Sequence, residues 1–146
     1  MTSVKTSPIN FHFLRQFSLS RRRKLKDFIA GIFHAEKVRV GAVSYIFCTD
    51  GYLLEINKQY LGHNYFTDII TFNLAEEGKP VSGEIYISVD RVVDNARELR
   101  LPFKEEMLRV IFHGVLHLCG YKDKSKAQIR EMRAREDHYL RRYLGK

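Results

Sequence analysis

The sequence predicts an α+β fold, a single compact domain (1–146) in which a short mixed β-sheet is packed with helices around one central helix. Its 146 residues suit one domain, and a domain of this size buries roughly two-thirds of the surface of the unfolded chain. Hydrophobic residues make up 45% of the chain and include ten Phe and eight Tyr, enough for a core without disulfides. Segments with strand and helix patterns alternate in the first two-thirds, and a helical part follows.

The N-terminal third is expected to form a strand, a helix and a second strand. Residues 9–14 predict the first, short strand. Ser18 or Ser20 can cap the helix, which continues to about residue 34 with apolar side chains at helical spacing on one side. Residues 38–48 are rich in β-branched and aromatic side chains and therefore predict the second strand.

The middle of the chain adds a helix and two strands. Asp50 is the predicted cap of the helix, which runs to about residue 61. Residues 68–74 (DIITFNL) and 84–89 (EIYISV) have the composition of strands. The segment 78–83 between them begins and ends with glycine, which predicts a turn.

Two further helices are predicted before the C-terminal segment. Ser88 or Asp90 can cap the first, which ends near residue 100. Pro102 starts the second, a helix over residues 104–119, because proline is favoured in the first turn. Gly120 follows this helix as a left-handed cap.

The last helix and the overall charge point to a polyanionic partner. This helix begins at Ser125, whose spacing to Gln128 predicts a capping box, and it ends near residue 144. It carries five arginines, and five of the six residues from 21 to 26, on the first turns of the first helix, are basic. The net charge is +8, which favours a polyanionic partner: nucleic acid, a ribonucleoprotein surface or an anionic membrane.

The sequence argues against export and against a membrane partner. No apolar run approaches the roughly 20 residues that span a bilayer, and residues 1–13 lack the apolar core of a signal peptide. Cys48 and Cys119 occur in unrelated apolar segments, which favours buried reduced thiols over a disulfide. We therefore expect a cytoplasmic protein.

His113 and His117 are the candidate metal ligands, and they make the central helix a candidate metal-binding helix. They are four residues apart, so their imidazoles lie on one helix face at a spacing that suits one ion. The helix is apolar nearly all round, and buried histidines need polar partners that a metal would provide. A histidine pair satisfied within the core is the alternative. Gly114 stands where the zincin peptidases have glutamate, so that class is disfavoured.

A third ligand has to come from outside the helix, because two side chains do not hold a catalytic zinc. Asp123 is the first candidate, since the helix ends shortly before it and the chain can turn back. The competitors are His63, His138 and Cys119, of which Cys119 is set aside because it points away from His113.

The run from His113 to Asp123, HGVLHLCGYKD, resembles the signature H-G-x-L-H-L-x-G-Y-D-H of the YbeY family, zinc-dependent endoribonucleases of ribosomal RNA maturation. Residues 57–60 (NKQY) and 67–72 (TDIITF) are similar to the N-x-x-Y and T-D-V-L-S-F segments of that family. Residues 83–88 (GEIYIS) are similar to its G-D-I-x-I-S strand. The resemblance extends from about residue 50 to the end of the chain.

This resemblance implies a function, a cofactor and partners. It implies cleavage of single-stranded RNA in maturation of the 3′ end of small-subunit rRNA and in ribosome quality control. The implied partners are rRNA, the small ribosomal subunit and its associated proteins. One Zn²⁺ per chain would be bound by His113, His117 and Asp123, with the fourth coordination position open.

The other catalytic and binding roles are less defined by the sequence. His63 and Asp68 are the candidates for a general base. Tyr65, Phe66 and Tyr121 are candidates to stack on bases, although aromatic residues more often belong to the core.

Two positions depart from the family pattern. Asp123 stands where the family usually has histidine; aspartate is a competent zinc ligand, but it lowers the positive charge of the site. Leu61 stands where the family often has an arginine, and His63, Lys58 or Arg91 are candidates to replace that cation.

Two other functions fit the same residues. One is a metallo-hydrolase that acts on another substrate, such as a peptide or a small phosphoester. The other is a ribosome-associated binding module with a structural zinc. The second alternative predicts a fourth protein ligand, for which His63 and His138 are candidates.

Overall fold

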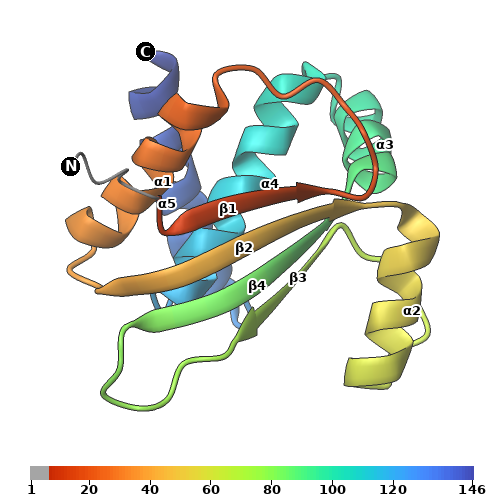
Figure 1. Cartoon of the computed structure of the whole chain (residues 1–146). Coiled ribbons are helices and arrows are strands. Elements are labelled where there is room, and N and C mark those ends of the chain that lie inside the picture. Colours follow the sequence, from red (N-terminus) through yellow and green to blue (C-terminus); the bar gives the residue numbers. More distant parts are fainter. Residues whose placement is uncertain (1–6) are drawn as a thin grey trace, which may run out of the picture.

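The computed structural model describes residues 7–146. The prediction that residues 1–13 lack a signal-peptide core therefore lies, for residues 1–6, outside the described residues. Within residues 7–146, four strands form one sheet and five helices pack around it, which confirms the predicted α+β class (Figure 1). In chain order, the elements are β1 (Ile9–Phe13), α1 (Arg22–Ala35), β2 (Val40–Cys48), α2 (Asp50–Leu61), β3 (Ile69–Asn73), β4 (Val81–Ser88), α3 (Val89–Leu99), α4 (Phe103–Leu118) and α5 (Lys126–Leu144).

The sheet is mixed, as predicted, and has the strand order β1-β2-β4-β3. β1 is parallel to β2 and β2 to β4, whereas β3 is antiparallel to β4 at one edge. Ile69 of β3 pairs with Ile87 of β4, and the Ser88 N–H donates to the Asp68 carbonyl oxygen at 2.9 Å. This pairing places Asp68 where β4 ends and α3 begins.

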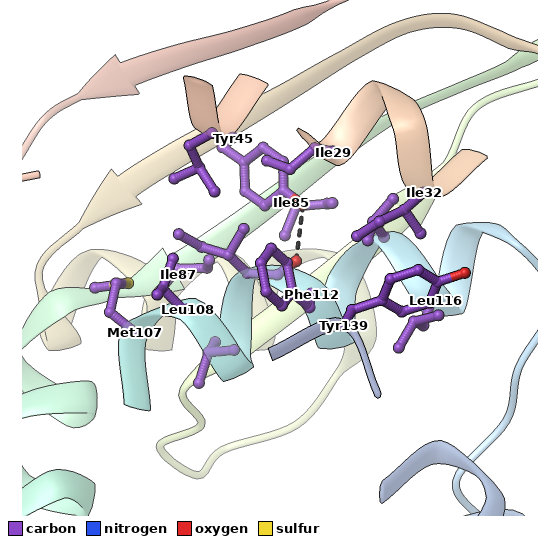
Figure 2. Close-up of a cluster of buried hydrophobic side chains, with 14 of the residues drawn as sticks. Ile29, Ile32, Tyr45, Ile85, Ile87, Met107, Leu108, Phe112, Leu116 and Tyr139 are labelled. Carbon is purple, nitrogen blue, oxygen red and sulfur yellow. Dashed lines mark hydrogen bonds between the residues drawn. The ribbon is translucent and has the colours of Figure 1, made fainter. Parts of the chain in front are cut away.

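Helix α4 occupies the centre of the core, against one face of the sheet (Figures 1 and 2). Ile85 and Ile87 of β4 belong to this main core, whereas Tyr86 packs against a smaller cluster that includes Leu53 of α2. Successive side chains of a strand point to opposite faces of the sheet, so α2 lies on the face opposite α4. The buried Tyr45 hydroxyl donates to the carbonyl oxygen of Ile111 in α4 at 2.8 Å, which links the helix to the sheet.

Gly114 lets α4 approach the sheet closely. A Cβ atom at this position would lie 2.8 Å from Cγ2 of Ile85 and 3.1 Å from Cδ1 of Ile69. Gly83 of β4 faces the end of the same helix, where a Cβ would lie 3.1 Å from Cδ2 of Leu118 and 2.7 Å from a β3 carbonyl oxygen. Both glycines are needed because larger side chains would push α4, and with it both candidate histidines, away from the sheet.

Two predicted helix caps are wrong. Arg21 occupies the N-cap position of α1 with a φ of 53° and no side-chain cap, so neither Ser18 nor Ser20 has this role. The segment before α1 packs apolar side chains against the core, which delays the start of the helix. Helix α2 is capped by Thr49 rather than Asp50, because the Thr49 Oγ1 accepts a hydrogen bond from a first-turn N–H at 3.1 Å.

One strand also begins earlier than predicted. β4 starts at Val81, which pairs with Val40, so the turn before it is shorter than expected. The other local signals are confirmed. Ser88 caps α3, and Ser125 and Gln128 form the predicted capping box at the start of α5.

The two cysteines are free thiols, as predicted: Cys48 is buried and Cys119 is partly buried. Within residues 7–146, no helix has the length and apolar character needed to span a bilayer.

Candidate metal centre

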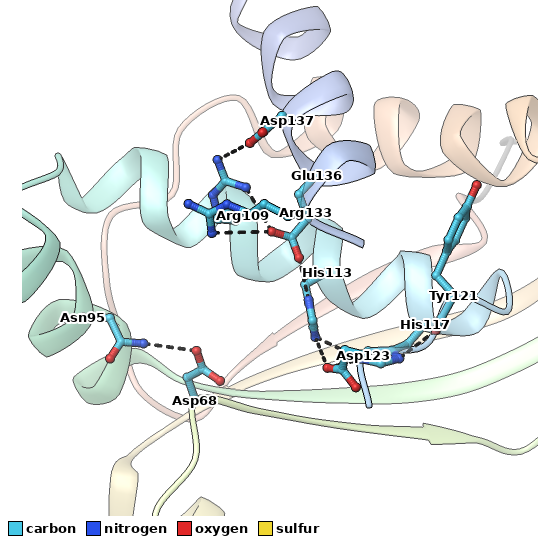
Figure 3. A network of polar contacts seen from close by, with 10 residues as sticks. All are labelled: Asp68, Asn95, Arg109, His113, His117, Tyr121, Asp123, Arg133, Glu136 and Asp137. Atoms are coloured by element: carbon cyan, nitrogen blue, oxygen red, sulfur yellow. Dashed lines mark hydrogen bonds and ion pairs between the residues drawn. The ribbon is translucent and has the colours of Figure 1, made fainter. Parts of the chain in front are cut away.

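Two histidines of α4 and one aspartate beyond its C-terminus bring three metal-ligand atoms together. The Nε2 atoms of His113 and His117 are 2.9 Å apart. The Oδ2 atom of Asp123 lies 3.3 Å from Nε2 of His113 and 3.2 Å from Nε2 of His117 (Figure 3). A metal ion could be held by this group, because its three ligand atoms all lie within 4.8 Å of one another. It is the one such group of His, Cys, Asp and Glu residues in the described part of the chain.

The turn after α4 returns Asp123 to the helix face that carries the histidines. Gly120 has a φ of 104°, which glycine adopts readily, and the Tyr121 N–H then donates to the Leu116 carbonyl oxygen at 3.1 Å. The hydroxyl of Tyr121 donates to Glu36 at 2.7 Å, which fixes the turn to the end of α1. Asp123 follows two residues later, so its position depends on this turn.

The Nδ1 atoms of both histidines are occupied by acceptors. Nδ1 of His117 lies 3.0 Å from the carbonyl oxygen of Tyr121, and Nδ1 of His113 lies 2.6 Å from Oε2 of Glu136. A carbonyl oxygen only accepts, so the Nδ1 atom of His117 carries the proton. The same tautomer is favoured in His113. Both Nε2 atoms then direct a lone pair toward Asp123, the arrangement that orients histidine ligands in metal sites.

The spacing of the ligand atoms fits a zinc ion. Zinc binds nitrogen and oxygen at about 2.0–2.1 Å, so neighbouring ligands of a tetrahedral site are about 3.3 Å apart. The three contacts of the cluster are 2.9, 3.2 and 3.3 Å. The donor set of two imidazoles and one carboxylate is also one that zinc accepts.

A buried ion-pair network holds His113 in place. Glu136 of α5 is 5% exposed; its Oε2 contacts His113, and its Oε1 accepts from Arg109 at 2.9 Å. The second arm of Arg109 donates to Asp137 at 2.7 Å (Figure 3). Sequence reasoning missed Glu136 and Arg109. Glu136 and His113 lie 23 residues apart on different helices, and no local pattern connects them.

Burial and the neighbouring carboxylates change the proton affinities of the site. Burial disfavours the charged form of His113, but the hydrogen bond and the charge of Glu136 outweigh it and raise the pKa of His113. The pKa of Asp68 is raised mainly by burial, against the opposing charge of His113. Asp68 therefore keeps its proton to a higher pH than an exposed aspartate.

The ligand cluster opens into a cavity of about 830 Å³, which Asp68 also lines. Asp68 Oδ2 accepts from the amide of Asn95 at 3.1 Å. His63, the other candidate base, does not line this cavity; its Nδ1 lies 2.9 Å from the exposed Tyr65 hydroxyl. The structure thus brings Asp68 into the cavity of the candidate metal ligands and leaves His63 outside it.

The competing third ligands are also remote from the cluster. Neither His63, His138 nor Cys119 belongs to the ligand group or lines the cavity. The ring of His138 packs edge-on against Tyr139 instead. Among residues 7–146, the group contains three ligands and no fourth, which leaves one position of a tetrahedral site open and argues against a closed structural zinc site.

The cations near the cavity are not the predicted ones. Arg91 pairs with Asp50 at 2.6 Å and lies 5.1 Å from the ring centre of the exposed Phe66. Lys58 pairs with Glu55 at 3.6 Å. Neither Lys58 nor Arg91 lines the cavity. The cations that do line it are Arg109, Lys124 and Arg133.

The comparisons with known proteins agree with this site. The family model described as endoribonuclease YbeY matches residues 15–144. A protein named endoribonuclease YbeY from Flavobacterium johnsoniae is 44% identical over 132 residues, which cover 90% of this chain and 94% of that protein. A protein of the same name from Porphyromonas gingivalis is 48% identical over 120 residues, covering 82% of this chain and 79% of that protein.

A solved structure has the same fold. The solution structure of TM1509 from Thermotoga maritima matches with a TM-score of 0.67 and 32% sequence identity, over 92% of this chain and 89% of that chain. The family model covers most of the described residues, including both histidines and Asp123. On this evidence the chain belongs to the endoribonuclease YbeY family.

Proposed function

We propose that this chain is a zinc-dependent endoribonuclease that cleaves single-stranded RNA, with one Zn²⁺ bound by His113, His117 and Asp123. The observation that carries the proposal is the convergence of two Nε2 lone pairs and one carboxylate oxygen within 3.3 Å of one another at the wall of an open cavity. The names of the relatives support the endoribonuclease activity. Maturation of the 3′ end of small-subunit rRNA is the proposed process.

Each part of the cavity has a role in this proposal. Zinc would supply a Lewis acid for a phosphoryl oxygen and lower the pKa of water to about 7. Arg133 and Lys124 of this chain would bind the phosphate, because both line the cavity and both are exposed. The Asp68 carboxylate would accept a proton from the attacking nucleophile. Asp68 is suited to this role because it lines the cavity of the ligand cluster.

We further propose the small ribosomal subunit and its associated proteins as partners, in the cytoplasm. The net charge of +8 supports a polyanionic partner. Exposed basic residues of α1 and α5, such as Arg23 and Arg130, are available for phosphate contacts.

The test is the metal content of untagged protein, wild type beside two variants of Asp123. We expect about one zinc per wild-type chain, loss or strong reduction in Asp123→Ala, and retention in Asp123→His, because histidine restores a zinc ligand at the same position. Lys122→Ala is the matched control, since Lys122 is exposed and outside the ligand group. Cleavage of a labelled single-stranded RNA should follow the zinc content.

Three outcomes would contradict the proposal. Zinc that is unaffected by Asp123→Ala would remove Asp123 from the ligand set. If the wild-type protein takes up no zinc, the two histidines do not form the proposed zinc site. A zinc-loaded protein that does not cleave RNA would separate metal binding from nuclease activity.

A further inference from the structure

The cavity extends beyond the candidate metal ligands along α4. Glu106 lies seven residues before His113, which is about two helical turns, so both side chains lie on the same helix face about 10 Å apart along the axis. Glu106 and Asp68 line the same cavity as the ligands. We call this end of the cavity, around Glu106, the acidic subsite.

Glu106 has a buried acceptor without a partner. The residue is 6% exposed, and its Oε1 has no hydrogen-bond partner within residues 7–146. Such atoms are rare in native proteins, because a buried polar atom that stays unpaired has lost its hydrogen bonds to water without replacement. The nearby cations do not satisfy it. Both arms of Arg109 are held by Glu136 and Asp137, and Arg133 forms an ion pair with Glu136.

The charge of Asp68 adds to the negative potential of the acidic subsite. The carboxyl oxygens of Glu106 accept hydrogen bonds from N–H donors, whereas the negative charge of the two acidic residues repels a phosphate. The positive charges of Arg109 and Arg133 near Glu106 oppose a second metal ion there. A neutral ligand with N–H donors therefore fits this end of the cavity best.

We propose that the acidic subsite binds the base of the nucleotide next to the cleaved phosphate and prefers bases that carry an amino group, namely adenine, cytosine and guanine, over uracil. Carboxylates accept hydrogen bonds from the amino groups of bases, as Glu and Asp do with the N4 amino group of cytosine. One nucleotide links a phosphate at the histidines to a base two helical turns away. This inference rests on the proposed nuclease function and adds a base preference to it.

The experiment compares RNA substrates that differ by one amino group. A pool of random single-stranded RNA is cleaved by zinc-loaded protein, and the ends are sequenced to find the preferred position. Cytosine is then replaced by uracil, and guanine by inosine, at that position. We expect each replacement to slow cleavage about tenfold in the wild type, a change of about 1.4 kcal/mol that lies within the range of one good base contact.

Glu106→Gln distinguishes base recognition from a structural role. The amide group adds an N–H₂ donor, which can pair with the O4 of uracil, so the preference should disappear or reverse while cleavage persists. Glu105→Gln is the matched control, because its side chain is more exposed and does not line the cavity; it should retain the wild-type preference. Metal analysis should give about one zinc per chain in the wild type and in both variants.

The outcomes separate this inference from the proposed function. Cleavage at equal rates on both members of each substrate pair would overturn the base preference and leave the nuclease assignment intact. If the wild type binds a second metal ion per chain and Glu106→Gln loses it, the acidic subsite is a cation site and the base preference is overturned. Absence of cleavage by zinc-loaded wild-type protein would overturn both. If Glu106→Gln does not fold, the wild-type comparison still decides, because it needs no variant.

Discussion

At the residue scale, the candidate metal centre depends on which nitrogen of each histidine carries its proton. Glu136 and the Tyr121 carbonyl oxygen occupy the Nδ1 atoms, and this leaves both Nε2 atoms free to bind an ion. The two acceptors differ in kind. A backbone carbonyl oxygen holds His117, whereas His113 depends on one buried side-chain carboxylate.

This dependence predicts that Glu136→Gln weakens metal binding without removing a ligand. The amide cannot supply the charge that holds the Nδ1–H of His113, and loss of such a partner typically reduces metal affinity 10- to 100-fold. The measurement is the zinc dissociation constant by chelator competition. Asp137→Asn is the control, because Asp137 contacts Arg109 but not His113. Equal affinities of Glu136→Gln and the wild type would contradict the role of Glu136.

At the element scale, α4 carries the site because it can lie unusually close to the sheet. Gly114 sits between the two histidines in sequence, and its missing side chain leaves room for Ile85 and Ile69. The face that carries the ligands and the face that packs on the sheet belong to the same two turns of helix. Packing and ligand geometry are therefore coupled.

Gly114→Ala should consequently destabilise the fold and disturb the site. The added Cβ would lie 2.8 Å from Ile85 Cγ2, and overpacking of this kind costs about 1–3 kcal/mol. Urea unfolding of the metal-free protein measures the effect. Gly31→Ala in α1 is the matched control, because a Cβ added there would have nothing within 4 Å; we expect it to be neutral or to stabilise by up to about 1 kcal/mol. Equal stability of both variants would refute the close packing.

Helix α5 contributes from a distance. Its capping box at Ser125 fixes where the helix starts, just beyond Asp123, and Glu136 follows three turns later on the side that faces α4. The same helix therefore supports the turn that carries Asp123, the third candidate ligand, and supplies the carboxylate that contacts His113.

At the scale of the whole molecule, a bound ion would link segments that otherwise meet only through packing. The ligands come from α4 and from the loop after it, and the supporting carboxylate comes from α5. Any ligand that binds the folded state alone stabilises it by mass action. The metal centre should therefore contribute to global stability as well as to catalysis.

We expect zinc to raise the unfolding temperature of chelator-treated wild-type protein, by an amount that grows with zinc concentration. At 100 times the dissociation constant the gain in the free energy of unfolding is about 2.7 kcal/mol. Asp123→Ala should show a much smaller increase at the same zinc concentration. Thermal unfolding followed by circular dichroism is the measurement, with Mg²⁺ as the control ion. An identical increase in both proteins would mean that zinc acts elsewhere.

Much of the architecture was predictable because its signals are local. Residue composition, hydrophobic patterning and capping residues predicted each of the four strands and five helices found within residues 7–146, and the pairs Ser125–Gln128 and His113–His117 follow from helical spacing. The errors fell at element ends, at the caps of α1 and α2 and at the start of β4, where packing or pairing competes with local preference.

The fold class, the histidine pair and the family resemblance could all be predicted before the fold was known, because their signals lie in residues a few positions apart. Three features appear only in the folded chain. Asp68 rather than His63 lies in the cavity, Asp50 pairs with Arg91, and Glu136 reaches His113. The physical reason is distance along the chain. The contacts that Arg91 and Glu136 make span 41 and 23 residues, so they depend on how the helices pack, which no local pattern encodes.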